Sequence, residues 1–186
     1  MLINNFVVPP RSQDEIERAA QMFRNSAGQA DGPLDMAQIL ELSDAFGFET
    51  SIDEESADRG YEAYYDPSEG KVLHLPESVY EDACNGLPRA RFTIAHELGH
   101  FALGHCATLA RVKDQTIPAY MTSEWQANAF AAALLMPRQA IYKHQLFSPD
   151  SLAQYFNVSL EAAKVRLKKL GFLYKNPNRD ASSIGT

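Results

Sequence analysis

The sequence predicts an α+β fold in which a small sheet interrupts a chain that is otherwise helical. Three observations lead to this prediction. Apolar residues recur three and four positions apart near the start of the 186 residues and again through the second half, which indicates helices. Short segments rich in β-branched and aromatic residues lie between, which indicates strands. The strands follow one another instead of alternating with helices, and this order favours α+β.

Two helices are expected before the sheet. The first covers 13–24 and carries Ile16, Ala20 and Phe23 on one face. The stretch 28–34 contains Asp-Gly-Pro and should break it. The second helix begins near Asp35 and ends at Gly47, because glycine readily adopts the left-handed conformation that closes a helix.

The sheet is expected to be a small antiparallel meander. Its strand candidates are 48–52, 61–65 and 71–75. The last two flank Asp-Pro-Ser-Glu-Gly at 66–70, which favours a hairpin. Two interpretations of 71–75 stay open: a sheet edge that pairs with an extended substrate peptide, or an edge kept short and charged against aggregation.

Only helices are expected after the sheet. Pro88 suits the first turn of a helix that runs through RARFTIAHELGHFAL to Gly104. Ser123 is expected to cap the next helix, EWQANAFAAALLM, which Pro137 stops.

The segment T-I-A-H-E-L-G-H at 93–100 contains an H-E-x-x-H pattern. On a helix, positions i and i+4 share a face, so His96 and His100 can present both imidazoles to one zinc ion. Glu97 follows the first ligand and lies beside the metal, where its carboxylate is placed to act as a catalytic base. A zinc site lowers the pKa of the water in its open position to about 7, within reach of such a base.

A catalytic zinc site needs a third protein ligand, and Glu124 is the best candidate. It stands at the start of a helix whose next turns are rich in alanine, and Gly99 on the first helix would allow close packing between the two. Asn128, one turn on, is a candidate hydrogen-bonding partner for the site. His105 is the less favoured alternative ligand, and Cys106 is expected to be a small buried residue.

A peptidase also needs a hydrogen-bond donor for the oxyanion that forms during hydrolysis. The sequence offers four candidates and does not choose among them: Tyr120, Tyr80, His105 and Arg138.

Composition narrows the class of protein. Two cysteines argue against a disulfide scaffold. The N-terminal MLINNFVVPPRS lacks the features of a signal peptide or a membrane span, so a cytoplasmic protein is expected. The net charge of −7 disfavours nonspecific binding to nucleic acid.

The charge is unevenly distributed along the chain. Residues 1–147 hold 11 Lys and Arg against 21 Asp and Glu, whereas 148–186 hold 6 against 3. We therefore expect a metallopeptidase domain at 1–147, a small helix-turn-helix-like segment at 148–172 and a flexible tail at 173–186. The basic helix in 160–170 could contact DNA, and the favoured alternative is a helical cap that packs on the peptidase.

The stretches RFTIAHELGHFALGH at 91–105 and SEWQANAFAAALLMP at 123–137 resemble the ImmA/IrrE family of metallopeptidases. The resemblance extends weakly over about 35–171. It implies a minimal zincin-like, gluzincin-type domain with His96, His100 and Glu124 as metal ligands and Glu97 as catalytic base. Zinc is the expected metal, and manganese is the alternative that this family relation leaves open.

Members of that family typically cleave a helix-turn-helix repressor of the Xre type, and some form toxin–antitoxin-like pairs with one. The resemblance therefore implies a separate repressor or antitoxin protein as the partner of this chain. Two rival functions stay open: a DNA-associated regulator with a metal site that is not catalytic, and a toxin-like protein that binds its partner without cutting it.

Overall fold

The protein is described by a computed structural model over residues 6–54, 63–66, 70–105 and 117–172. The elements before the sheet and within it are α1 (Gln13–Ser26), α2 (Met36–Glu41), α3 (Ser43–Phe46), β1 (Glu49–Asp53), β2 (Tyr64–Asp66) and β3 (Val72–Pro76). The elements after it are α4 (Glu77–Cys84), α5 (Pro88–Ala102), the 3-10 turn η1 (Ala119–Met121), α6 (Ser123–Leu135), α7 (Arg138–Lys143), α8 (Pro149–Phe156) and α9 (Leu160–Lys169). The predicted α+β class is confirmed.

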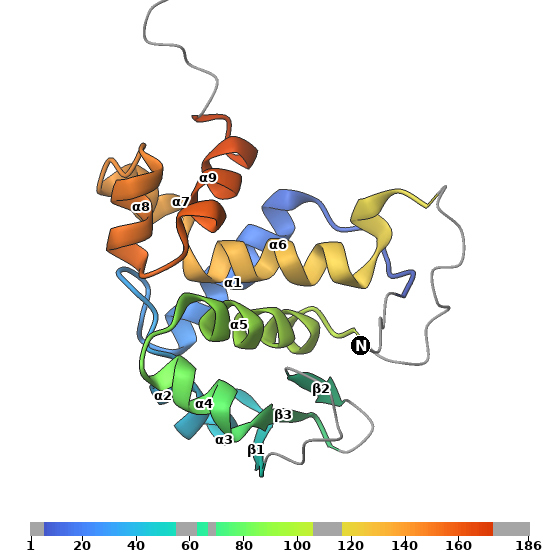
Figure 1. Cartoon of the computed structure of the whole chain (residues 1–186). Helices are drawn as coiled ribbons and strands as arrows, with labels where there is room; N and C mark the ends of the chain where they lie inside the picture. The colour runs from blue at the N-terminus through green and yellow to red at the C-terminus, as the bar shows by residue number, and fades with distance from the viewer. Residues whose placement is uncertain (1–5, 55–62, 67–69, 106–116, 173–186) are drawn as a thin grey trace, which may run out of the picture.

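Helices α1, α5 and α6 pack against one another in the middle of the molecule (Figure 1). The sheet and the short helices α2 to α4 lie on one side of this central group, and α7 to α9 lie at the other end. The buried apolar residues form one continuous cluster that extends from Ile16 on α1 to Leu167 on α9. The C-terminal helices are therefore part of the same core, to which they add Leu152 and Phe156.

Local sequence accounts for most helix ends. Ser12 and Glu15 form a capping box at α1, and Asp35 accepts a hydrogen bond from the Gln38 amide at α2. Pro88 occupies the first turn of α5, as predicted. The cap of α6 is Thr122, however, and not Ser123. The Ser123 hydroxyl instead accepts a hydrogen bond from the Phe6 amide at 3.0 Å, a contact with a distant segment that local sequence does not reveal.

The three-stranded sheet is mixed, with strand order β1-β3-β2, and not the antiparallel meander that we expected. The β2–β3 pair is antiparallel, but β1 runs parallel to β3, with Thr50 opposite Leu73. A hairpin pattern identifies two neighbouring strands and contains no information about where an earlier strand joins. The segment 71–75 is consequently the central strand of this sheet, so both interpretations of it as an edge strand, one pairing with substrate and one kept short and charged, are wrong.

The C-terminal helix pair is present, and its second helix carries four cations: Lys164, Arg166, Lys168 and Lys169. One of the four is not available to DNA. Lys164, Lys168 and Lys169 on α9 are exposed, whereas Arg166 is 1% exposed and faces the body of the protein. DNA contact by this segment stays a prediction. The predicted flexible tail at 173–186 lies outside the described residues. None of the helices in the described ranges has the length and hydropathy of a membrane span.

Candidate metal centre

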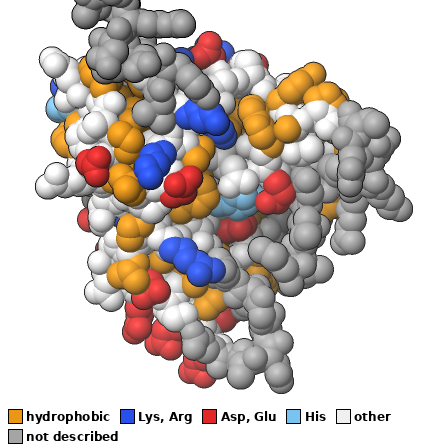
Figure 2. Space-filling view, turned by 45° about the horizontal axis from the view of Figure 1, so that its top comes forward, with side chains coloured by type: hydrophobic (Ala, Val, Ile, Leu, Met, Phe, Trp, Pro, Cys, Tyr) orange, Lys and Arg blue, Asp and Glu red, His pale blue; other side chains and the backbone are white. Residues whose placement is uncertain are grey.

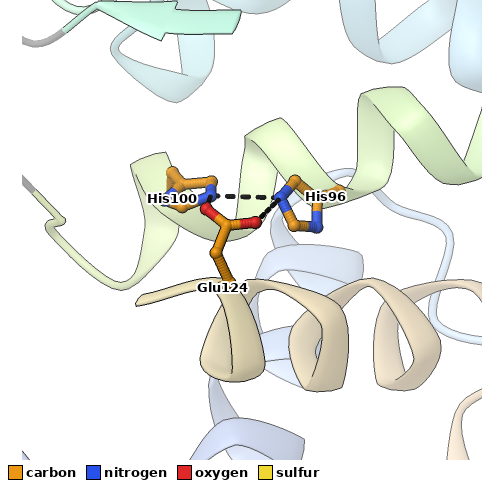
Figure 3. Close-up of side chains that lie close together, drawn as sticks. All are labelled: His96, His100 and Glu124. Carbon is orange, nitrogen blue, oxygen red and sulfur yellow. Dashed lines mark hydrogen bonds and ion pairs between the residues drawn. The ribbon is translucent and has the colours of Figure 1, made fainter. Parts of the chain in front are cut away.

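Two helices bring His96, His100 and Glu124 together (Figure 3). Both imidazoles come from α5 and the carboxylate from the first turn of α6. The two Nε2 atoms are 3.1 Å apart. The Glu124 carboxylate places one oxygen 3.3 Å from His96 Nε2 and the other 3.4 Å from His100 Nε2. The residues predicted as ligands are thus within reach of one ion.

These distances suit a tetrahedral zinc site. With zinc–ligand bonds of about 2.0–2.2 Å, neighbouring ligand atoms in a tetrahedron are separated by roughly 3.3–3.6 Å. The three separations of 3.1, 3.3 and 3.4 Å are close to that range. Two imidazoles and one carboxylate also form a donor set typical of catalytic zinc, and they leave the fourth position to water or substrate. The residues present therefore fit the ion.

The cluster is accessible from solvent. The His96, His100 and Glu124 side chains are 16%, 13% and 33% exposed. In the space-filling view, histidine and acidic side chains reach the surface beside each other in a hollow of the molecule (Figure 2). A substrate could therefore approach the open coordination position from this face.

Close packing between α5 and α6 sets the separation of the ligands. A Cβ atom on Gly99 would lie 3.0 Å from both the Cα and the carbonyl oxygen of Ala127, and 3.3 Å from the Phe130 Cβ. Such distances are too short for an unstrained side chain, so only glycine lets the two helices approach this closely. The reason inferred from the sequence for a glycine inside α5 is present in the structure.

The N-terminal segment holds the start of α6. Val7 forms an antiparallel bridge with Thr122, and the Val8 amide donates to the Met121 carbonyl at 2.9 Å. The Ser123 amide donates in turn to the Phe6 carbonyl at 2.9 Å. Glu124, the next residue, therefore follows a stretch of backbone that the N-terminal segment holds in place.

Glu97 lies beside the three ligands and is not one of them. One carboxylate oxygen accepts a hydrogen bond from the Tyr65 amide on β2 at 3.0 Å. Burial raises the pKa of Glu97 above its ordinary value, against the opposing effect of the charges on His100 and His96. A raised pKa suits a carboxylate that must accept a proton during the reaction.

Contacts within the ligand cluster shift the pKa values of Glu124 and His96. Burial alone would raise the pKa of Glu124, but hydrogen bonds from His100 and His96 outweigh it and lower that pKa to about 2. Burial likewise opposes protonation of His96, yet the Glu124 hydrogen bond and the Glu97 charge raise the pKa of His96. A bound divalent cation would take the place of the shared proton, so metal binding and protonation compete here.

His105 lies next to the cluster but behind it. Its Nδ1 is 3.1 Å from His100 Nδ1, the ring nitrogen that faces away from Glu124. Its Nε2 is 3.2 Å from the Gln126 side-chain oxygen. Burial, together with the charge on His100, lowers the pKa of His105 to about 4. The three-residue ligand group found among the described residues does not include it. Gln126 was not foreseen, and a glutamine two residues after a ligand is too weak a pattern to find it.

The structure places the four candidates for the oxyanion donor in different surroundings. Tyr80 lines a separate cleft with Glu41 and Asp44. Arg138 forms an ion pair with Asp14 at 2.8 Å, and His105 lies behind His100. Tyr120 is 46% exposed and precedes Glu124 by four residues.

Asn128, the candidate hydrogen-bonding partner for the site, lies beside the ligands. The Asn128 side chain donates to the Glu124 backbone carbonyl at 2.8 Å, and a further hydrogen bond to His96 contributes to the raised pKa of that imidazole. Asn128 thus contacts two members of the cluster. Cys106 lies outside the described residues.

Comparison with known proteins adds independent information. The family model described as the IrrE N-terminal-like domain, Peptidase M78, matches residues 48–168. No curated protein matches the chain. A solved structure described as a Mycobacterium tuberculosis transcriptional regulator is similar, with a TM-score of 0.56 and 25% sequence identity over 81% of this chain and 45% of the other. The chain therefore spans less than half the length of that regulator.

Proposed function

Because the chain belongs to the IrrE N-terminal-like family of M78 peptidases, we propose that it is a zinc-dependent endopeptidase that hydrolyses a peptide bond in a specific protein partner. The metallopeptidase-type function follows from the family. The metal, the catalytic roles of single residues and the substrate are the further steps of the proposal, each with its own test.

The observation that carries the proposal is the convergence of two imidazoles and a carboxylate next to a second, partly buried carboxylate, that of Glu97. A purely structural zinc site is closed by four protein ligands and needs no base. The described cluster supplies three ligands, and Glu97 stands beside them with a raised pKa. This arrangement favours a hydrolytic site over a structural one.

In the proposed reaction, His96, His100 and Glu124 would hold a zinc ion. Zinc, when bound, supplies Lewis-acid activation of the scissile carbonyl and of the attacking water. Glu97 accepts the proton of that water at a carboxylate oxygen and passes it to the leaving amine. The Tyr65 amide donates to one Glu97 oxygen, so the other oxygen is directed to this proton transfer. Tyr120 is the remaining candidate for the oxyanion donor.

We propose a separate repressor of the Xre type, or an antitoxin of that type, as the partner. Two considerations support a regulatory substrate. The chain resembles a family whose members cleave such repressors, and a structurally similar protein is described as a transcriptional regulator. Binding energy from contacts remote from the scissile bond would then be needed for turnover, so we expect little activity on short generic peptides.

The metal is tested by elemental analysis of purified wild type, His96→Ala and Glu124→Ala. We expect about one equivalent of zinc in the wild type and loss of zinc in both variants. Manganese in place of zinc would correct the metal and keep the site. A wild-type protein that binds neither metal after reconstitution would overturn the proposal.

Proteolysis is tested by comparing wild type with Glu97→Gln, which keeps the three ligands. Mass spectrometry of new N-termini, after each protein is produced in cells that contain candidate repressors, would identify the cleaved bond. We expect the cut only with the wild type, and loss of general-base catalysis lowers the rate by about 10²–10⁴-fold. Equal cleavage by Glu97→Gln would remove this residue from the mechanism.

A regulator with an inert metal site is the second candidate, favoured by the description of the similar structure and by the exposed lysines of α9. It predicts salt-dependent DNA binding that Glu97→Gln does not affect, and no proteolysis. A stable, uncut complex with the partner protein would instead favour the toxin-like alternative.

A further inference from the structure

A line of hydrogen bonds leads from the back of His100 into the protein. His100 Nδ1 faces His105 Nδ1 at 3.1 Å, and His105 Nε2 faces the Gln126 side-chain oxygen at 3.2 Å. The Gln126 side-chain nitrogen donates to the Pro9 and Tyr120 carbonyls, each at 2.9 Å. His105 is 6% exposed and Gln126 is fully buried, so water does not compete for these contacts.

The backbone carbonyls of Pro9 and Tyr120, at the far end of this line, determine which atom donates and which accepts in every hydrogen bond along it. Backbone carbonyls only accept, so the Gln126 amide nitrogen must face Pro9 and Tyr120, and its oxygen must face His105. His105 Nε2 therefore carries a hydrogen and donates to that oxygen. In a neutral imidazole the other nitrogen is then an acceptor, so His105 Nδ1 accepts from His100 Nδ1.

A cationic His105 would reverse the bond to His100. The partners of its ring are an imidazole and an amide, and neither offsets the cost of burying a positive charge. With His105 neutral, His100 carries a hydrogen on Nδ1, so Nε2 is the nitrogen that binds the metal once the proton it shares with Glu124 leaves. That Nε2 is the atom 3.4 Å from Glu124 and 3.1 Å from His96.

We propose that His105 is a positioning residue that determines the metal-binding tautomer of His100 before the metal binds. The tautomer of His105 is determined in turn by Gln126, whose amide is oriented by the Pro9 carbonyl. The inference rests on the proposed metal site and adds residues to it that touch neither metal nor substrate. A ligand imidazole whose other nitrogen is held as a donor binds metal more tightly, because its tautomer does not have to change and its ring does not have to reorient.

The line also connects the metal centre to a part of the chain outside the matched family region, which covers 48–168. Pro9 belongs to the N-terminal segment that pairs with the residues before Glu124. The same segment thus supports one ligand through the backbone and another through Gln126 and His105.

Two substitutions of His105 separate this role from a general packing role. Asparagine places its side-chain oxygen near the position of Nδ1, so His105→Asn keeps an acceptor for His100. Glutamine places its amide near the position of Nε2, so His105→Gln keeps the contact with Gln126 and loses that acceptor. Both replacements are neutral amides, and both remove the ring.

The first readout is zinc affinity, measured by competition with a chelator. We expect His105→Gln to bind zinc about 10–100-fold more weakly than wild type, the usual effect of losing such a partner. His105→Asn should retain most of the affinity. Equal losses in both variants, or none in either, would overturn the proposal. His144→Gln is the control, because His144 is also hydrogen-bonded but pairs with Asp31, away from the cluster.

The second readout is independent of bound metal and of activity. In metal-free wild type, ¹⁵N NMR of the imidazoles should show the hydrogen of His100 on Nδ1 and that of His105 on Nε2. In His105→Gln the His100 signals should shift toward the other tautomer. A metal-free wild type in which His100 Nδ1 carries no hydrogen would overturn the inference, even if zinc binds. Failure of the proposed metal site would look different, since the wild type would then bind no zinc at all. An inert metal site would appear only as the absence of proteolysis, with both readouts unchanged.

Discussion

Glu17 on α1 and Arg166 on α9 form a two-pronged ion pair that is almost fully buried. The guanidinium nitrogens lie 2.6 and 2.9 Å from the two carboxylate oxygens. Arg166 also donates to the Met136 carbonyl, at 3.0 Å from Nε and 2.9 Å from Nη2. A cation of the basic C-terminal helix is therefore used to attach that helix to the first helix of the protein and to the end of α6.

This pair yields a prediction about stability. Glu17→Gln leaves the Arg166 charge buried without its carboxylate, so the free energy of unfolding should fall by about 3–5 kcal/mol. Urea unfolding would measure the loss. The double variant Glu17→Met with Arg166→Met should recover much of it, because a well-packed apolar pair is often as stable as a buried ion pair. A single variant as stable as wild type would show that the pair contributes little.

The approach of α5 to α6 yields a second prediction. Gly99→Ala places a methyl group 3.0 Å from the Ala127 backbone, so the helices must separate and Glu124 must move relative to the two histidines. We expect a loss of about 1–3 kcal/mol in unfolding free energy, as for other overpacked sites, together with weaker zinc binding. Ala102→Ser, on the exposed end of the same helix, is the control and should change neither. Unchanged zinc affinity in Gly99→Ala would show that the helix separation does not set the ligand geometry.

The loop before α2 yields a pH-dependent prediction. Hydrogen bonds from Lys143 and His144 hold the pKa of Asp31 well below its ordinary value of 3.8. A carboxyl whose pKa is lowered by folding stabilises the protein at pH values above its pKa in the unfolded state. This contribution is lost as the pH falls through its pKa in the folded state. Asp31→Asn should therefore cost a few tenths to about 1 kcal/mol at neutral pH, as for exposed ion pairs. Denaturant melts from pH 7 to pH 2 should show the difference shrinking below about pH 4. A constant difference would contradict this assignment.

Metal removal yields a fourth prediction. An ion that binds only the folded state at 1,000 times its Kd stabilises that state by about 4 kcal/mol. For a chain of this size such a gain raises the Tm by roughly 8–16 °C. Calorimetry with and without a chelator would measure it. His96→Ala should melt at the same temperature in both conditions, and Glu97→Gln should respond like wild type. A wild-type Tm that ignores the chelator would argue against a bound metal.

The sequence alone determined the features that depend on short-range geometry. The spacing of His96 and His100 requires that they share a helix face, and Pro88 and Pro137 mark where helices begin and end. The glycine inside α5 was correctly expected to have a packing reason. Each of these inferences rests on one turn of helix or one backbone preference, which neighbouring residues control.

Tertiary structure decided whatever depends on residues far apart in the chain. The sequence identified Glu124 as the best candidate for the third ligand, but the contact between α5 and α6 is what brings its carboxylate to the imidazoles. No local sequence pattern indicates three further features: the parallel pairing of β1 with β3, the position of Arg166 against Glu17, and the line of hydrogen bonds from His100 to Pro9. Long-range packing selects these contacts, because burial and hydrogen-bond satisfaction are properties of the whole core and not of any short segment.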